Sequence, residues 1–488
     1  MVVFAITAYN SHGYIHADEH YQIIEFANLK SEAVQAKDLP WEYHEKIRPA
    51  LQPMMAYEVF RIAHFFTIRD PYVLCFILRM MTAIFALFCI NRFVIATKRF
   101  VEEKNQKMYY AMSYLLWFIP YLSVRFSSEC WSGLTFLLAL SLVLDYEKRR
   151  TYFFVGCLLG LSFLFRFQSA FLSLGLILWL IFIKKESRIN LLKICGAGML
   201  ILGVGLVIDY WFYGVWTCTF WNYLNINLIK DKASEFGTSS WYYYFRYIFN
   251  FSTGIFGIII LLSIVVLLIK DRRSIVLWIT LPFLLVHSMI PHKEERFLFP
   301  IIYYLPIVLM MAYQKTEPLK SRLFKSMFNR YLFYFILGIF ILANSIGLAA
   351  MATRSAGIGR MEITKYIHEN YGDKSIRLLF LNISNPYDPW QFLKANFYEE
   401  KNMEERKIES LCELDSMSSD SSKTILLVIS EATLKTVACK DAFDRFHFKK
   451  KIQSIPKFTE NSTNWLEGIN KNLRLRDNEN TLILYAHD

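Results

Sequence analysis

The sequence predicts a mainly helical protein that crosses a membrane many times and ends in a small α/β domain. Of its 488 residues, 55% are hydrophobic and only 20% are charged, and the mean hydropathy is +0.28. The apolar residues lie in runs close to the roughly 20 residues that span about 30 Å of hydrocarbon. Short basic clusters separate these runs, and the runs stop near residue 352.

Apolar segments, about eleven by this reading, make up a membrane domain that we assign to residues 1–352. The first, Val2–Tyr9, is too short to span a membrane. The others lie near Tyr72–Ala96, Met108–Val124, Trp131–Leu144, Tyr152–Phe165, Ala170–Ile183, Leu191–Ile208, Phe251–Ile269, Ile275–Ile290, Leu298–Tyr313 and Tyr331–Met351.

The positive charges between these segments predict the orientation of the chain. One set of loops carries 19 Lys and Arg residues, and the alternate short loops carry few. The basic loops are Lys98–Lys107, Glu147–Arg150, Lys184–Lys193, Lys270–Arg273 and Lys315–Arg330. Because basic loops stay in the cytosol, this set should face it. The net charge of +12 is therefore a membrane feature, and we expect lipid contacts and no nucleic-acid partner.

The other side, periplasm or ER lumen, then receives a first loop at residues 11–70, the segments 209–250 and 291–297, and the tail. The tail, residues 353–488, has apolar runs at Ile376–Leu381, Thr424–Ile429 and Thr481–Tyr485. Helix-like stretches lie near Glu362–Asn370 and Glu431–Cys439. These alternating patterns predict a separate small α/β domain on the extracytoplasmic side.

The first group of candidate functional residues is His16-Ala17-Asp18-Glu19-His20-Tyr21-Gln22, in the first loop. A carboxylate near apolar spans suits a general base that takes a proton from a hydroxyl group. The residues alone are more typical of a solvated loop. Neighbouring carboxylates also suit a divalent cation, so metal dependence stays open, although no CxxC or His/Cys cluster indicates zinc.

The second group is Pro291-His292-Lys293-Glu294-Glu295-Arg296-Phe297, between two apolar segments. His292, Lys293 and Arg296 are the donor types that stabilise a phosphate, and Glu294 or Glu295 could orient them. The alternative is a knot of salt bridges that anchors a short loop at the interface.

Two further groups lie on the same side. Aromatic and amide residues that suit sugar stacking or lipid contact include Trp211, Tyr213, Trp221 and Asn222. An interfacial belt is the commoner meaning of such a run. Tight hairpins carry Arg125-Phe126-Ser127-Ser128-Glu129 and Arg166-Phe167-Gln168, which either reach the site or cap helix ends.

These motifs together resemble the lipid-phosphate-mannose-dependent mannosyltransferases of N-glycan and GPI-anchor assembly, glycosyltransferase family 22 of the GT-C superfamily. The segment 292–297 looks like the family's H-K-E-x-R-F, and Asp18-Glu19 with Tyr21-Gln22 resembles P-D-E-x-x-Q. Trp41-Glu42-Tyr43 with Ile47-Arg48-Pro49 resembles W-E-W…L-R-S. Asp209–Gly214 and Trp221-Asn222-Tyr223 resemble D-x-W-F-Y-G and its continuation. The resemblance covers residues 9–300 in the family's order; Ala17 replaces its usual proline, and the tail shows no match.

The resemblance implies a GT-C membrane fold and an enzyme that moves a mannosyl or similar hexosyl residue with inversion. The donor would be a polyprenyl- or dolichyl-phosphate sugar, and the acceptor a glycan or glycolipid. Asp18, or else Glu19, would be the base, and His292, Lys293 and Arg296 would hold the donor phosphate. Trp211, Tyr213, Trp221, Asn222 and Arg166 would contact substrate. The rival hypothesis is a transporter or flippase for lipid-linked sugars, which should place ionisable residues near the membrane midplane.

Overall fold

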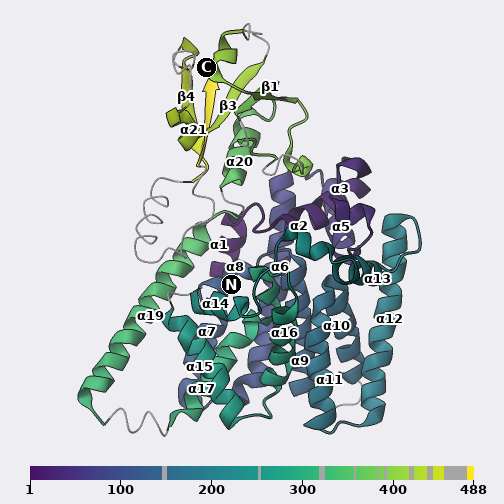
Figure 1. Ribbon diagram of the computed structural model, residues 1–488, viewed down its shortest axis with the longest axis vertical. Helices are drawn as coiled ribbons and strands as arrows, with labels where there is room; N and C mark the ends of the chain where they lie inside the picture. The colour runs from purple at the N-terminus through teal and green to yellow at the C-terminus, as the bar shows by residue number, and fades with distance from the viewer. Residues whose placement is uncertain are drawn as a thin grey trace. The chain divides into compact units, whose positions relative to one another are not determined.

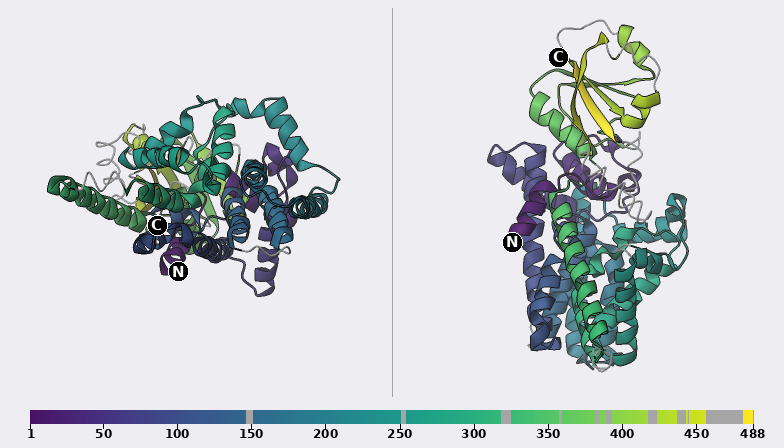
Figure 2. Two further views of the ribbon diagram at one scale, coloured as in Figure 1. Left: turned by 90° about the horizontal axis from the view of Figure 1, so that it is seen from below. Right: turned by 90° about the vertical axis from the view of Figure 1, so that its left-hand side faces the viewer.

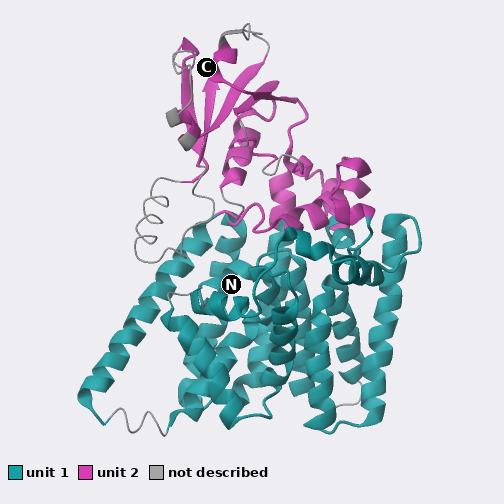
Figure 3. Ribbon diagram, viewed as in Figure 1, with its two compact units in different colours: residues 1–10, 45–56, 77–354 teal, residues 11–44, 57–76, 355–488 magenta. Residues whose placement is uncertain are grey.

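A computed structural model describes residues 1–145, 151–250, 254–317, 325–356, 359–381, 384–388, 393–416, 423–436, 443, 445–455 and 481–487. Over these ranges the chain is mainly helical and forms two compact units (Figure 3). Unit 1 comprises residues 1–10, 45–56 and 77–354; unit 2 comprises residues 11–44, 57–76 and 355–488. The predicted boundary at residue 352 lies near the last passage from unit 1 to unit 2, and as a folding-domain boundary it stays a prediction.

Unit 1 is built from apolar helices, which Figure 2 shows partly end-on. Helices α5 (Leu51–Phe65) and α6 (Pro71–Thr97) contribute to both units. The remaining helices of unit 1 are α1 (Val2–Asn10), α7 (Gln106–Leu115), α8 (Phe118–Leu122), α9 (Ser128–Asp145), α10 (Thr151–Phe165), α11 (Ala170–Phe182), α12 (Arg188–Tyr213), α13 (Thr219–Leu224), α14 (Tyr243–Asn250), α15 (Ile255–Lys270), α16 (Ile275–Met289), α17 (Leu305–Lys315) and α19 (Met327–Thr353).

The protein is a multi-pass membrane protein. Within the described residues, 5 helical segments are long and apolar enough to cross a membrane, and four shorter apolar helices accompany them. The finer estimate of about eleven spans stays a prediction. Segment Met108–Val124 is divided into α7 and α8, because Leu116 adopts an extended conformation between them. The predicted basic loop at residues 147–150 lies outside the described residues.

Close helix pairs organise unit 1. Helix α10 packs against α9 and α12, and α11 packs against α16 (Figure 1). At the α11–α16 contact, a Cβ on Gly175 would lie 2.2 Å from the carbonyl oxygen of Trp278. Only glycine permits this approach, and small residues at helix contacts are typical of membrane bundles. Helix α9 also packs against a 3₁₀-helical segment, Glu295–Tyr304, which carries the end of the second motif.

Unit 2 contains the expected α/β tail. Its sheet has five strands in the order β2-β1-β3-β5-β4, parallel between β2, β1 and β3 and antiparallel from β3 to β5 to β4. The strands are β1 (Ile376–Leu381), β2 (Met403–Ile408), β3 (Thr424–Ser430), β4 (Phe448–Gln453) and β5 (Leu482–His487). Helices of unit 2 are α2 (Ala17–Glu19), α3 (Glu25–Lys30), α4 (Trp41–His44), α20 (Arg360–Tyr371) and α21 (Glu431–Thr436).

The sheet has an apolar core and a covalent constraint beside it. Leu379, Ile408, Leu427 and Ile483 belong to one buried cluster, which explains why the apolar runs predicted as strands are strands. Cys412 is disulfide-bonded, while Cys439 lies outside the described residues. Disulfide bonds persist in oxidising compartments, which agrees with the predicted extracytoplasmic position of the tail.

Candidate functional site

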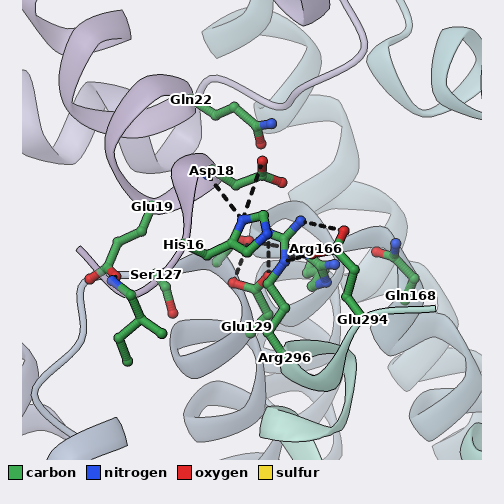
Figure 4. Close-up of polar contacts among 12 residues, drawn as sticks. His16, Asp18, Glu19, Gln22, Ser127, Glu129, Arg166, Gln168, Glu294 and Arg296 are labelled. Atoms are coloured by element: carbon green, nitrogen blue, oxygen red, sulfur yellow. Dashed lines mark hydrogen bonds and ion pairs between the residues drawn. The ribbon is translucent and has the colours of Figure 1, made fainter. Parts of the chain in front are cut away.

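In unit 1, a buried carboxylate joins two arginines that are far apart in the sequence. Oε1 of Glu129 lies 2.7 Å from Nη1 of Arg166 and 2.9 Å from Nη1 of Arg296 (Figure 4). On its other side, Arg296 donates from Nε and Nη2 to the two oxygens of Glu294, at 2.7 and 2.9 Å. Glu129, Arg166 and Arg296 are each less than a tenth exposed. The result is a row of alternating charges, buried at Glu129, Arg166 and Arg296 and partly exposed at Glu294.

Glu129, Arg166 and Arg296 each lie at the end of an apolar element. Glu129 lies in the first turn of α9, where a negative charge is favoured by the helix dipole. Arg166 follows the last residue of α10 in an extended conformation. Arg296 lies in the first turn of the segment Glu295–Tyr304. The pattern of helix ends therefore brings the charges together at one edge of the apolar bundle.

His292 joins the cluster through Glu294, and Lys293 is its neighbour in the sequence. His292 donates from Nδ1 to the carbonyl oxygen of Gly237 at 3.0 Å, and its Nε2 lies 3.1 Å from Glu294. The carboxylate of Glu294 raises the pKa of His292, which favours the positive imidazolium. Lys293 donates to the carbonyl oxygens of Ser239 and Ile290, at 2.8 and 2.6 Å, and burial lowers its pKa. The structure thus brings together His292, Arg296 and Arg166, whereas the ammonium group of Lys293 binds backbone carbonyl oxygens.

The phenyl ring of Phe297 lies beneath this cluster. The guanidinium carbons of Arg166 and Arg296 are 4.9 and 5.5 Å from the centre of the ring. The rings of His287 and His292 each have their centres 6.1 Å from it. One aromatic ring therefore attracts both guanidinium groups by cation–π interaction.

The D-x-W-F-Y-G motif forms hydrogen bonds with segment 45–50 in unit 1. Asp209 accepts a hydrogen bond from the backbone N–H of Ala50 at 2.8 Å and another from Thr219 at 2.8 Å. Tyr213 donates to the carbonyl oxygen of Arg48 at 2.8 Å. Gly214 ends α12 with a φ of 71°, a left-handed conformation that suits glycine. These contacts fasten segment 45–50 to α12.

Asn222 donates to the carbonyl oxygen of Lys46 at 3.1 Å and so also binds segment 45–50. Trp211 and Trp221 have exposed side chains. For Trp211, Tyr213, Trp221 and Asn222, contact with substrate stays a prediction.

In unit 2, Asp18 and Glu19 lie in the short helix α2. The Nδ1 atom of His16 is 3.7 Å from Oδ1 of Asp18 and caps the helix by accepting from the Asp18 N–H. Oε2 of Glu19 accepts from the backbone N–H of Ile15 at 3.0 Å. Glu19 thus hydrogen-bonds the backbone of the loop, and the role of Asp18 or Glu19 as a base stays a prediction.

The residues after Glu19 link three parts of unit 2. Gln22 donates to Glu42 at 2.8 Å, which joins the first-loop motif to the W-E-Y motif. The Nε2 of His20 lies 2.9 Å from Glu25, and the His20 ring is stacked on Tyr398 of the tail. A π-helical turn, His20–Ile24, carries these side chains, and such turns are frequent at functional sites.

Sequence reasoning named His20 only as part of the first-loop group, left Glu129 either reaching the site or capping a helix end, and did not name Glu25. Their functional signal is the partner that each one meets, which only the fold reveals. Among the described residues, no group of three or more His, Cys, Asp or Glu side chains is arranged to hold a metal ion.

Comparison with known proteins places these motifs in one family. The sequence profile of the Alg9-like mannosyltransferase family matches residues 1–382. A GPI alpha-1,2-mannosyltransferase 3 from Bos taurus is 23% identical over 374 residues, which cover 76% of this chain and 66% of that protein. The Arabidopsis thaliana mannosyltransferase APTG1 is 24% identical, over 61% of this chain and 54% of that protein. The chain thus spans about half to two thirds of the length of these relatives.

A solved structure shares the fold. The crystal structure of ArnT from Cupriavidus metallidurans bound to undecaprenyl phosphate aligns with a TM-score of 0.54 at 10% identity. The alignment covers 100% of this chain and 96% of that one. At this identity the likeness concerns the fold alone, and it agrees with the GT-C-type fold expected from the sequence.

Proposed function

This chain belongs to the Alg9-like mannosyltransferase family, and on that basis we propose that it transfers a mannosyl residue from a polyprenyl- or dolichyl-phosphate donor to a lipid-linked glycan or glycolipid. The observation that carries the proposal is the cluster of Arg166, Arg296 and His292 around the carboxylates of Glu129 and Glu294, with both arginines buried. Buried cations next to apolar helices suit a phosphate whose lipid tail stays in the membrane. A transporter has no comparable support, because the matched family is one of transferases.

The cations of this cluster favour departure of the phosphate. When the acceptor oxygen forms its bond to the anomeric carbon, the bond from that carbon to the phosphate oxygen breaks. The electron pair leaves with the phosphate, whose negative charge grows at that oxygen. Fixed guanidinium groups stabilise such a charge more in the transition state than in the ground state. Glu129 and Glu294 keep the guanidinium groups in place before the donor binds. Their negative charges also weaken the attraction of the guanidinium groups for the phosphate.

The proton of the attacking hydroxyl passes to a base, which we assign to Asp18. A single base suffices, because a phosphate leaves without being protonated. One displacement at the anomeric carbon then inverts its configuration, in contrast to the two-step reaction of retaining enzymes. The contact of Glu19 with the loop backbone supports Asp18 as the base.

Names of relatives point to the acceptor. The relatives from Bos taurus and several other animals are named GPI alpha-1,2-mannosyltransferase 3. A relative from Schizosaccharomyces pombe, matched over 34% of this chain, is named for a lipid-linked N-glycan precursor. We therefore propose a mannose-bearing GPI precursor as the first acceptor to test. The charge asymmetry of the loops supports a site on the non-cytosolic face of the ER or of a bacterial inner membrane.

The test is transfer by the purified full chain. It is incubated with radiolabelled polyprenyl-phosphate mannose and with GPI and N-glycan precursors, and the products are separated by chromatography. Asp18→Asn keeps the shape of the side chain but removes the proton acceptor. It should lower turnover by roughly 10²–10⁴ with donor binding retained, as expected for a general base. A matched Glu19→Gln variant should stay closer to wild type. Absence of transfer to every acceptor by the wild-type chain would refute the proposed function, and normal turnover by Asp18→Asn would exclude Asp18 as the base.

A further inference from the structure

Three buried polar side chains, on the segments that follow Arg166 and precede His292, have no hydrogen-bond partner within the described residues. They are Ser169, just before α11, and His287 and Ser288, near the end of α16. Their exposed fractions are 1%, 2% and 5%. Serine and threonine in apolar helices usually return their hydroxyl to the carbonyl four residues earlier. Thr280 does so on α16, at 2.7 Å from the oxygen of Val276. A buried hydroxyl or imidazole group that has no hydrogen-bond partner is an exception that requires an explanation.

The unpartnered atom of His287 is an acceptor. Its Nδ1 lies 2.8 Å from the carbonyl oxygen of Phe283, which can only accept, so Nδ1 carries the proton. In the neutral ring Nε2 then offers a lone pair. The surroundings favour the neutral ring, because Phe171, Phe283 and Phe297 have their ring centres within 6.0, 4.1 and 6.1 Å of it. A group that donates an uncharged hydrogen bond, such as a hydroxyl, is the matching partner.

The position of His287 indicates which hydroxyl this is. Its ring meets Phe297, the same ring that lies under the guanidinium groups of Arg166 and Arg296. In a polyprenyl-phosphate sugar, the sugar is bonded directly to the phosphate. A sugar must therefore lie beside any phosphate that these arginines hold. Ser169 and Ser288 add hydroxyl groups that can donate as well as accept.

We propose that His287, together with Ser169 and Ser288, forms the subsite that recognises the hydroxyl groups of the donor sugar, with Nε2 of His287 accepting a hydrogen bond from one of them. This inference rests on the proposed function. It assigns the choice of sugar to the end of the α11–α16 pair and the binding of the phosphate to the neighbouring arginines. A site built to bond a hydroxyl group rejects the analogue that lacks it, because its own polar atom is then left unpaired.

Deoxy donors test the assignment. The purified full chain is assayed with polyprenyl-phosphate mannose and with the corresponding donors that lack one sugar hydroxyl at a time. For the wild type, kcat/KM should fall roughly 100-fold or more with one particular deoxy donor. His287→Leu removes the acceptor, so it should slow transfer of mannose while that one analogue reacts nearly as well as mannose. His287→Gln supplies a carbonyl oxygen and should restore part of the discrimination.

Matched variants separate recognition from packing. Thr280→Val lies on the same helix but removes a hydroxyl whose partner is its own helix, so it should leave discrimination unchanged. Ser169→Ala and Ser288→Ala should each weaken discrimination, and they serve if His287→Leu does not fold. If the His287 and serine variants slow all donors equally, with the wild-type ratio between mannose and its deoxy analogues intact, the subsite is refuted while the transferase stands. If the wild type transfers from no polyprenyl-phosphate mannose, the proposed function fails first and the subsite with it.

Discussion

Replacement of Arg296 by lysine should affect stability, donor binding and turnover together. Arg296 makes three charge-assisted contacts, one to Glu129 at 2.9 Å and two to Glu294 at 2.7 and 2.9 Å. A lysine keeps the charge but not the planar fork, so it can retain about one of these contacts. A hydrogen bond to a charged group contributes about 1.5–3 kcal/mol. Allowing for relaxation around the shorter side chain, we expect Arg296→Lys to lose on the order of 3 kcal/mol of stability.

The same change should weaken the donor site. If one charge-assisted contact to the phosphate is lost, donor affinity should fall roughly 10- to 100-fold, since each 1.4 kcal/mol is a factor of ten. Turnover should fall as well, because the guanidinium is expected to act most strongly on the departing phosphate. Arg296→Ala should be more severe, about 3–5 kcal/mol in stability, since it removes a cationic partner both from the buried Glu129, which retains Arg166, and from the partly buried Glu294, which retains His292.

Thermal unfolding in detergent, donor binding by calorimetry and single-turnover transfer measure the three effects. The matched control is Arg61→Lys, whose guanidinium also contacts a carboxylate, that of Glu58, but is 64% exposed. An exposed ion pair contributes little to stability, so this variant should behave as wild type. If Arg296→Lys lowers the Tm while each folded molecule binds donor and turns over normally, the cluster is only an anchor and the phosphate role is refuted.

Two further predictions concern the tail and the topology. His368 lies 2.6 Å from Glu400 and 3.1 Å from Asp70. The bond to Glu400, opposed by burial and helped by Asp70, raises its pKa to about 9. A pKa that is higher in the folded state contributes stability that is fully present below the unfolded value of about 6.5 and is lost as the pH rises through the folded value. The Tm should therefore decline between about pH 6.5 and 9, and His368→Asn should flatten this decline. A parallel decline in both proteins would exclude His368 as the cause. The topology is tested with Glu103→Cys and Lys401→Cys, two exposed positions, in a background without Cys195 and Cys218. The two new cysteines should react with an impermeant maleimide from opposite sides of sealed vesicles. Labelling of both from one side would refute the orientation.

The tail illustrates what an apolar pattern can and cannot predict. The three runs that become β1, β3 and β5 are recognisable because these strands bury their side chains. Strands β2 and β4 were missed, since their sequences, MEERKI and FKKKIQ, are mostly charged or polar. The strand order makes both of them edge strands. Charged side chains on edge strands oppose edge-to-edge aggregation, so the feature that hides these strands in the sequence follows from their place in the sheet.

The candidate site divides in the same way. His292, Lys293 and Arg296 are neighbours in the sequence, so their cluster was predictable. Glu129 lies 167 positions from Arg296 and meets it only because α9 packs against the segment Glu295–Tyr304. The role of Glu294 in orienting Arg296 was foreseen as one of two options, and Glu295 instead accepts a hydrogen bond from Tyr243.

By itself, the sequence determined the membrane class, the positions of most apolar helices, the α/β tail and the family. These depend on composition, on short periodic patterns and on motifs whose residues are adjacent. Tertiary structure alone decided that one buried carboxylate serves two arginines, that Tyr213 and Asn222 hold backbone carbonyls, and that His287 keeps an unpartnered acceptor beside Phe297. The physical reason is that the partner of a buried polar group is set by the packing of distant helices, and apolar periodicity specifies which face is buried without specifying what it meets.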